Sequence, residues 1–293
     1  MLQYKLSKIL EILGHKLSPT NYISRKERKY NIWGKEIILP PNHPLQQLVH
    51  NFPKYQRNLQ QIADLLFEKN NSYNFIDIGA NIGDTAQLLN ENSKKEIYSI
   101  EGDEFYFKYL IRNSKGDSNI KPLNFFLSDE INKSVAIRVE NGTGVPYELD
   151  INVSKKSTTS ELITLDKLFD KLNLSNVCLV KIDTDGFDLK ILMGGCTMIA
   201  KEKPILFIEI DPCQYGDKGY SFEDISRFLV NVGYSNCIWF DYAGGEILRS
   251  SMSNFDISNQ LINYVSKKNN LIPYYDLAIF PENHIDIFEK IVK

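Results

Sequence analysis

Two glycines and two polar side chains alternate along one short stretch of the sequence, Asp77-Ile78-Gly79-Ala80-Asn81-Ile82-Gly83. The apolar run Phe75–Ile78 is typical of a buried strand, and a helical pattern begins near Asp84, whose carboxylate we expect to cap that helix. Glycine accepts positive φ and lets a ligand lie against bare backbone, so Gly79 and Gly83 suit a binding turn between the strand and the helix. The helix N-terminus behind the turn offers free N–H groups to an electron-rich ligand.

The chemistry of this turn favours a cationic nucleoside over a dinucleotide. A dinucleotide site reads G-x-G-x-x-G around a pyrophosphate. This turn has no G-x-G, and the negative charge of Asp77 would repel a pyrophosphate. S-adenosylmethionine carries an ammonium and a sulfonium group and no phosphate, so a carboxylate attracts it. The pattern Asp77-x-Gly79-x-Asn81-x-Gly83 therefore predicts an S-adenosylmethionine site.

Strands and helices alternate along most of the chain. Hydrophobic patterns predict strands over 75–78, 96–101, 123–127, 177–182, 204–210, 236–240, 246–248 and 275–280, and helices over 86–89, 105–112, 165–172, 187–199, 222–232 and 257–265. This order indicates an α/β fold with a doubly wound, mostly parallel sheet and helices on both faces. A ligand then lies beyond the carboxyl ends of the strands. We expect five acids that close predicted strands to share that rim: Asp77, Glu101, Asp129, Asp183 and Glu209.

The chain divides into two predicted parts. Residues 1–70 form an N-terminal extension with an amphipathic helix over 1–16, an irregular segment that could hold a hairpin around Gly34, and a helix over about 46–69 that breaks at Pro53. Residues 71–293 form the α/β domain, in which 134–160 fit a β-excursion or a mobile flap. The helix over 1–16 could rest on a membrane surface, but packing on the domain, or on a second subunit of a homo-oligomer, is favoured.

Composition and charge exclude several classes of protein. Hydrophobic content of 43% and charged content of 24% over 293 residues are those of a soluble globular protein, and a net charge of −3 gives no bulk attraction to nucleic acid. No run is long enough for a transmembrane segment or apolar enough for a signal peptide. The four cysteines are widely spaced, which indicates reduced thiols in a cytoplasmic protein. The sequence also lacks G-x-S-x-G, H-E-x-x-H and P-loop signatures.

The sequence resembles the FkbM-type methyltransferases over roughly residues 70–235. The resemblance rests on five segments: Phe75–Asp84, Ser99–Asp103, Leu165–Asp166, Val180–Asp188 and Pro204–Pro212. It implies the class I methyltransferase (Rossmann-like) fold, S-adenosyl-L-methionine as cofactor, and O-methylation of a hydroxyl acceptor, a sugar in glycan or polysaccharide biosynthesis. Where the family more often has Val-Glu-Gly, this chain has Thr184-Asp185-Gly186, which keeps the acid but shortens it by one methylene.

The resemblance implies a role for each residue of the glycine turn. Gly79 and Gly83 would shape the turn beside the methionine part of the cofactor. Asp77 would accept hydrogen bonds from the turn or hold the cofactor's ammonium. Asn81 would orient the loop with its amide, although an ordinary surface turn residue fits the same position.

Further cofactor contacts, with Gly102 among them, follow the next two strands. Glu101, followed by Gly102, stands close to the roughly 20-residue offset at which an acid meets ribose hydroxyls in nucleotide folds. Two vicinal hydroxyls match its two carboxylate oxygens. Asp129, with Ser128 and Leu127, would contact the adenine amino group, and an ordinary turn is the alternative.

The residues at the end of the central strand are the candidates for catalysis. Methyl transfer to a hydroxyl is an in-line displacement, so alignment of the reacting atoms supplies much of the rate. Asp183, also a candidate cofactor contact, is the preferred base or orienter of the hydroxyl, with Glu209 second. Lys181 and Asp185 are candidates too, but an internal ion pair or a helix cap explains them equally well. Two acids could instead hold Mg²⁺; no third ligand is evident, so no metal site is predicted.

Two other functions stay open. One is a nicotinamide-dependent oxidoreductase or epimerase on the same sheet, against which the missing G-x-G counts. The other is a noncatalytic, scaffolding relative whose N-terminal helix binds a partner. His43, His50 and His284 could act as bases, but lone histidines in weakly patterned segments are more typical of structural or exposed positions.

Overall fold

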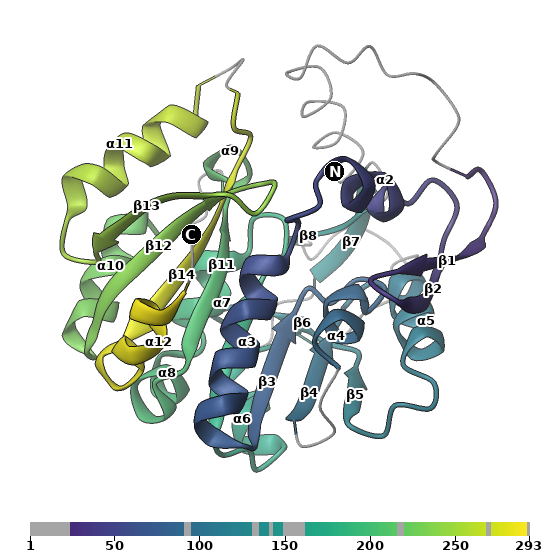
Figure 1. Cartoon of the computed structure of the whole chain (residues 1–293), viewed down its shortest axis with the longest axis horizontal. Helices are drawn as coiled ribbons and strands as arrows, with labels where there is room; N and C mark the ends of the chain where they lie inside the picture. Colours follow the sequence, from purple (N-terminus) through teal and green to yellow (C-terminus); the bar gives the residue numbers. More distant parts are fainter. Residues whose placement is uncertain are drawn as a thin grey trace.

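An eight-stranded sheet forms the centre of the molecule in the computed structural model, which describes residues 24–90, 95–130, 135–140, 143–148, 162–215, 220–267 and 271–291 (Figure 1). Its strands, in spatial order, are β13 (Glu246–Ser251), β12 (Tyr234–Asp241), β14 (Tyr275–Pro281), β11 (Ile205–Ile210), β10 (Val177–Ile182), β3 (Tyr73–Ile78), β4 (Lys95–Ile100) and β5 (Ile120–Leu123). The strands from β5 to β11 are parallel, whereas β14 is antiparallel to both of its neighbours and β13 to β12. The predicted doubly wound, mostly parallel sheet is confirmed.

Helices cover both faces of this sheet (Figure 1). One face packs against α3 (Arg57–Asn70), α4 (Asp84–Leu89) and α12 (Ile285–Lys290), and the other against α6 (Leu165–Lys171), α7 (Asp188–Met193), α8 (Cys196–Glu202) and α10 (Phe222–Asn231). Central strands are therefore apolar on both sides. In β3, Phe75 belongs to the first core and Ile76 and Ile78 to the second. Because side chains alternate along a strand, Asp77 lies on the same face as Phe75.

The described part of the chain begins with a two-stranded hairpin followed by two helices. The predicted hairpin is present as β1 (Arg28–Ile32) and β2 (Lys35–Leu39), with Trp33 and Gly34 at positive φ in its turn. Next come α2 (Leu45–Asn51) and α3, and the predicted helical break at Pro53 separates them. The predicted amphipathic helix over 1–16, and with it any membrane or subunit contact, lies outside the described residues.

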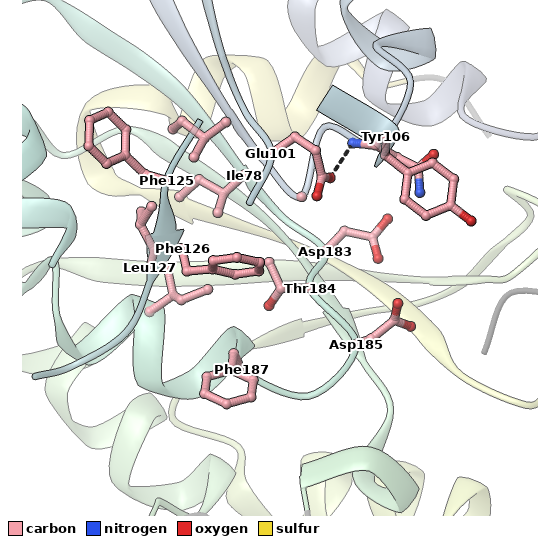
Figure 2. A pocket seen from close by; sticks show the side chains of 14 residues that line it. Ile78, Glu101, Tyr106, Phe125, Phe126, Leu127, Asp183, Thr184, Asp185 and Phe187 are labelled. Atoms are coloured by element: carbon pink, nitrogen blue, oxygen red, sulfur yellow. Dashed lines mark hydrogen bonds between the residues drawn. The ribbon is translucent and has the colours of Figure 1, made fainter. Parts of the chain in front are cut away.

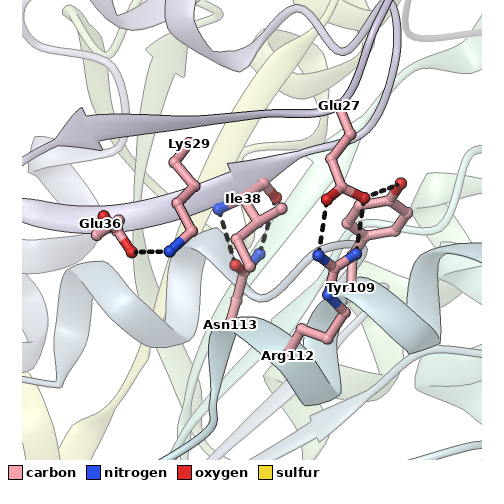
Figure 3. Close-up of polar contacts among 7 residues, drawn as sticks. All are labelled: Glu27, Lys29, Glu36, Ile38, Tyr109, Arg112 and Asn113. Atoms are coloured by element: carbon pink, nitrogen blue, oxygen red, sulfur yellow. Dashed lines mark hydrogen bonds and ion pairs between the residues drawn. The ribbon is translucent and has the colours of Figure 1, made fainter.

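Hydrogen bonds fasten the hairpin to α5 (Glu104–Asn113), as Figure 3 shows. The Asn113 amide binds both backbone groups of Ile38: Oδ1 accepts from N–H at 2.8 Å and Nδ2 donates to the carbonyl at 3.1 Å. Arg112 donates two hydrogen bonds of 2.7 Å to Glu27, which also accepts from the Tyr109 hydroxyl. The exposed ion pair contributes little, about 0–1 kcal/mol, so the contacts of the buried Asn113 and the apolar packing are the main attachment.

The remaining elements connect or extend this core. They are β6 (Phe126–Leu127), β9 (Leu162–Ile163), β7 (Val135–Glu140), β8 (Thr143–Glu148), α9 (Pro212–Tyr215), α11 (Phe255–Val265) and the 3-10 helix η1 (Glu282–His284). β7 and β8 are antiparallel, as the predicted β-excursion requires. Wherever the structure describes the chain, no helix combines the length and the apolar character needed to cross a membrane.

The predicted strand over 123–127 is wrong. β5 ends at Leu123, and β6 instead pairs with β9 in a separate two-stranded sheet. The chain leaves the large sheet because the Asn124 amide turns back to the carbonyl groups of Glu101 and Gly102, and the Phe126 ring packs against Gly102. A hydrophobic pattern does not report such a side-chain contact between distant residues.

The single helix predicted over 187–199 is also wrong, because α7 and α8 are separated at Gly194 and Gly195. A Cβ on Gly194 would lie 2.2 Å from the Ser128 carbonyl oxygen, so this position admits only glycine. The Asp166 carboxylate then accepts hydrogen bonds from the backbone N–H groups of Thr197 and Met198 at the start of α8. This acid therefore has a structural role as a cap.

Candidate active site

A cavity of about 580 Å³, its open mouth included, lies at the carboxyl ends of β3, β4 and β10. This volume is within the usual range for small-ligand sites. Figure 2 shows aromatic and aliphatic side chains gathered at one end and acids near the other. The lining residues are Ile78, Gly79, Asn81, Ile100, Glu101, Tyr106, Phe125, Phe126, Leu127, Asp183, Thr184, Asp185, Phe187 and Ile191.

The glycine turn lets two strand ends meet below this cavity. Gly79 and Gly83 have φ of 79° and 84°, and a Cβ on Gly79 would lie only 1.9 Å from the Asp183 carbonyl oxygen. The Asp183 N–H donates to the Ile78 carbonyl at 3.0 Å, which ties the end of β10 to the end of β3. The predicted cap at Asp84 is wrong: Gly83 is the N-cap and makes no side-chain hydrogen bond, and Asp84 is the first, buried residue of α4.

The close approach at Gly79 gives a prediction with a matched control. Gly79→Ala is expected to lower the free energy of unfolding by about 3 kcal/mol or more, because the new methyl group overlaps a backbone carbonyl as well as straining φ. Gly34→Ala has the same left-handed φ but nothing within 4 Å of the added Cβ, and is expected to cost about 1 kcal/mol. Denaturant unfolding of both variants checks the difference, and equal losses would contradict the close approach.

The Glu101 carboxylate is held in place from below. Asn81 N–H donates to its Oε2 at 2.8 Å and Asp103 N–H to its Oε1 at 2.7 Å. Burial raises the pKa of Glu101 to about 7, and the two backbone hydrogen bonds act in the opposite direction. Each carboxylate oxygen keeps a further lone pair. Glu101 can therefore accept hydrogen bonds from two neighbouring hydroxyl groups in the cavity.

A cluster of charges, two of them buried, lies next to the glycine turn. Lys181 Nζ is 3.0 Å from Asp183 Oδ2 and 3.8 Å from Asp77 Oδ1. The attraction of Asp183 and Asp77 outweighs burial and raises the pKa of Lys181, which stays charged. Asp77 is fully buried, and neither of its oxygens has a hydrogen-bond partner among the described residues. Asp77 thus balances the lysine charge from beneath the site and does not line the cavity; its predicted contact with an ammonium group stays a prediction.

The turn after β10 is shaped by an acid that sequence reasoning did not select. The Asp188 carboxylate accepts hydrogen bonds from the backbone N–H groups of Thr184 and Gly186 at 2.8 and 3.0 Å. Asp185, between them, has φ of 54°. This arrangement projects Asp185 outward beside Asp183 (Figure 2), and both line the cavity. The sequence could have indicated this acid, because Asp188 is the last residue of Val180–Asp188, one of the segments on which the family resemblance rests.

A second cavity of about 520 Å³ adjoins the first and shares Gly79, Asn81, Asp183 and Asp185 with it. Its other lining residues are His43, Leu45, Leu48, Tyr55, Gln56, Asp84, Thr85 and Lys181. The N-terminal segment supplies five of these, at positions 43–56, and only His43 among them was considered from the sequence, as a possible base. The hydrophobic periodicity of this segment is weak, and His43 is the only histidine among the five lining residues.

Buried acids make stability depend on pH. Burial raises the pKa of Asp84 to about 7. Between about pH 4 and 7 the folded protein keeps the Asp84 proton, whereas the unfolded chain releases it. The contribution of Asp84 to the free energy of unfolding is therefore complete below about pH 4 and is lost as the pH rises to about 7. Asp84→Asn cannot ionise, so we expect it to be more stable than the wild type by on the order of 4 kcal/mol at about pH 8 and nearly unchanged near pH 4. Thermal unfolding at both pH values checks this, with the exposed Asp170→Asn as control; a gain independent of pH would contradict it.

The other predicted site residues lie outside both cavities. Ser128 donates to the carboxylate of Asp129 at 2.9 Å, and Lys190 lies 3.9 Å from that group. Gly102 packs against the Phe126 ring. Glu209 is inside β11, opposite Asp276 in the sheet.

The expected rim of five acids is wrong in part. Asp77 and Glu209 are within strands, and Asp129 follows β6, which is outside the large sheet. The adenine contact and the second base stay predictions.

Residues 77–235, more than half of the chain, match the sequence model of the methyltransferase FkbM domain. No curated protein matches the sequence. Among solved structures, methyltransferase FkbM of Methylobacillus flagellatus aligns with a TM-score of 0.44 at 13% identity, over 71% of this chain and 44% of that one. This chain therefore spans less than half of that protein. The plantazolicin methyltransferase BamL, solved in complex with SAH, aligns with a TM-score of 0.43 at 14% identity, over 80% and 88% of the two chains.

Proposed function

Because the chain belongs to the FkbM methyltransferase family, we propose that it transfers the methyl group of S-adenosyl-L-methionine to a hydroxyl group of a sugar, in glycan or polysaccharide biosynthesis. One observation carries this proposal: the two cavities meet at Asp183, Asp185 and the glycine turn. A methyl donor in one cavity and an acceptor in the other would bring their reacting atoms together at that boundary.

The first cavity fits the nucleoside part of the donor. Phe126, Leu127 and Phe187 offer apolar surface for a flat base. Glu101 lies where it can accept hydrogen bonds from both hydroxyl groups of a ribose. The nearby cluster has two acids, Asp77 and Asp183, for one lysine, and this excess of negative charge favours a cation. When bound, S-adenosylmethionine supplies an activated methyl group on its sulfonium.

Asp183 is the group best placed to act on an acceptor hydroxyl. Its side chain is about one-third exposed and lines both cavities. The ion pair with Lys181 at 3.0 Å fixes one carboxylate oxygen. Asp183 would orient the hydroxyl and accept its proton as the oxygen attacks the methyl carbon, a contribution of about 10²–10⁴ in rate. Asp185, at the same boundary, would hold a second hydroxyl of the acceptor.

The composition of the second cavity supports a polyhydroxylated acceptor. Besides the acids, Tyr55, Gln56 and Thr85 offer groups that can donate or accept hydrogen bonds, and Leu45 and Leu48 offer a small apolar surface. Sugars have this combination of many hydroxyls and short C–H faces. The wall of the second cavity has three acids, Asp84, Asp183 and Asp185, for one lysine. This negative charge disfavours an acceptor that carries a phosphate next to the reacting hydroxyl.

Mass spectrometry tests the proposal directly. The protein is incubated with S-adenosylmethionine and a panel of neutral monosaccharides, oligosaccharides and nucleotide sugars, and each acceptor is examined for a gain of one methyl group. We expect methylation at a hydroxyl oxygen of a sugar, with stoichiometric formation of S-adenosylhomocysteine. Methylation only at nitrogen or carbon, or only of non-sugar acceptors in a parallel panel, would contradict the proposed substrate class.

A further inference from the structure

His43 brings the N-terminal segment into contact with the glycine turn, at Asn81. It lies between β2 and α2, outside the stretch 77–235 that matches the family domain, and its side chain is only 9% exposed. Its Nε2 is 3.2 Å from Asn81 Oδ1, and its Nδ1 is 3.3 Å from the backbone nitrogen of Leu45. Because the Leu45 N–H donates to Nδ1, the hydrogen of the neutral ring is on Nε2 and points to Asn81.

The contact continues from Asn81 to Glu101. Asn81 has φ of 51°, a conformation that places its backbone N–H on Glu101 Oε2 at 2.8 Å while its side chain reaches His43. Asn81 therefore links the imidazole to the carboxylate through two separate groups, because its side-chain oxygen accepts from His43 and its backbone N–H donates to Glu101. These two contacts connect the N-terminal segment to the acid that faces the first cavity.

The His43 imidazole is suited to act as a fixed, uncharged hydrogen-bond donor. Burial lowers the pKa of His43 to about 4, so the ring stays neutral throughout the physiological range. Tyr106, which lines the first cavity, contacts the ring edge with centroids 6.4 Å apart. The segment that carries His43 is itself held on α5 through the hairpin, by Asn113. The ring is thus fixed from several sides before any ligand binds.

We propose that His43 is a positioning residue for the cofactor site, which holds Asn81 so that Glu101 presents both oxygens to the ribose. This inference rests on the proposed function, because it assumes that Glu101 binds the ribose of the methyl donor. Without the imidazole, Asn81 would lose the partner of its side chain, and the turn would have to become ordered when the donor binds. Part of the binding free energy would then be spent on that ordering.

Calorimetric titration with S-adenosylhomocysteine tests the assignment without any acceptor. His43→Phe keeps a ring of similar shape but removes the donor, and is expected to bind about tenfold more weakly. His43→Gln places an amide N–H near the position of Nε2, and is expected to stay within about threefold of the wild type. His50→Phe changes an exposed histidine of α2 and is expected to leave the affinity unchanged.

A double-mutant cycle separates positioning from general packing. Asn81→Gly tolerates the positive φ and removes the amide that His43 contacts, so it should weaken binding about as much as His43→Phe does. In the Asn81→Gly background, His43→Phe should then cost nothing further. Full additivity, or wild-type affinity in His43→Phe, would overturn the inference. If His43→Phe fails to fold, as judged by circular dichroism, wild-type affinity in Asn81→Gly would overturn it. A wild-type protein that binds neither S-adenosylmethionine nor its product would instead contradict the proposed function.

Discussion

Glu101→Ala is expected to weaken the binding of S-adenosylhomocysteine by about a hundredfold, since two hydrogen bonds to a charged group are lost together. The carboxylate is fixed by Asn81 and Asp103 before the ligand arrives, so its loss removes a preorganised contact rather than a flexible one. The loss should be the same for S-adenosylmethionine, because the two molecules share the ribose. Calorimetric titration of the purified variant measures both affinities.

Two controls distinguish the ribose contact from a general effect of charge. Glu101→Gln keeps the shape and one acceptor oxygen, so we expect a loss between that of alanine and the wild type. Glu96→Ala removes an exposed acid from the same strand, β4, and should leave the affinity unchanged. If Glu101→Ala binds the product as tightly as the wild type does, the assignment of the ribose to this acid is wrong.

Asp183→Asn should leave the binding of S-adenosylhomocysteine, which lacks the sulfonium charge, nearly intact and remove most of the turnover. The asparagine Oδ1 can still accept from Lys181, which now lies 3.0 Å from the carboxylate, so the local packing is preserved. What is lost is the negative charge that orients the acceptor hydroxyl and takes its proton. A decrease in kcat of about 10²–10⁴ is expected, with the Kd for S-adenosylhomocysteine within about threefold of the wild-type value.

Steady-state kinetics with the acceptor found by mass spectrometry, together with calorimetry, separate these two effects. Asp170→Asn makes the same chemical change on the exposed side of α6 and should retain wild-type kcat. An Asp183→Asn variant with unchanged kcat would exclude Asp183 as the base. An equal loss of cofactor affinity and kcat would assign it to donor binding instead.

Local patterns predicted the parts of the site that depend on local backbone. Gly79 and Gly83 have the positive φ expected of them, and Glu101 and Asp183 follow β4 and β10 directly and line one cavity. Each of these follows from a strand, a turn and the parallel order of the sheet, which a hydrophobic pattern encodes well. The family prediction is confirmed by the match over residues 77–235.

Tertiary contacts decided the features that the sequence did not predict. The end of β5 depends on the Asn124 amide reaching the carbonyl groups of Glu101 and Gly102. The position of His43 depends on how the hairpin packs on α5, so its contact with Asn81 has no signature in either segment alone. Asp77 was expected on the rim of the sheet, but it is buried below Lys181 because of the face of β3 on which it lies.

Every role proposed for these residues depends on the binding of a cationic, phosphate-free nucleoside between Glu101 and Asp183. Binding of this kind is measured by calorimetric titration of the wild-type protein with S-adenosylmethionine, and with NAD⁺ under the same conditions. We expect saturable binding of S-adenosylmethionine and no detectable binding of NAD⁺, because the site has acids where a pyrophosphate would lie and no G-x-G turn to hold it. Tighter binding of NAD⁺ than of S-adenosylmethionine would contradict the account.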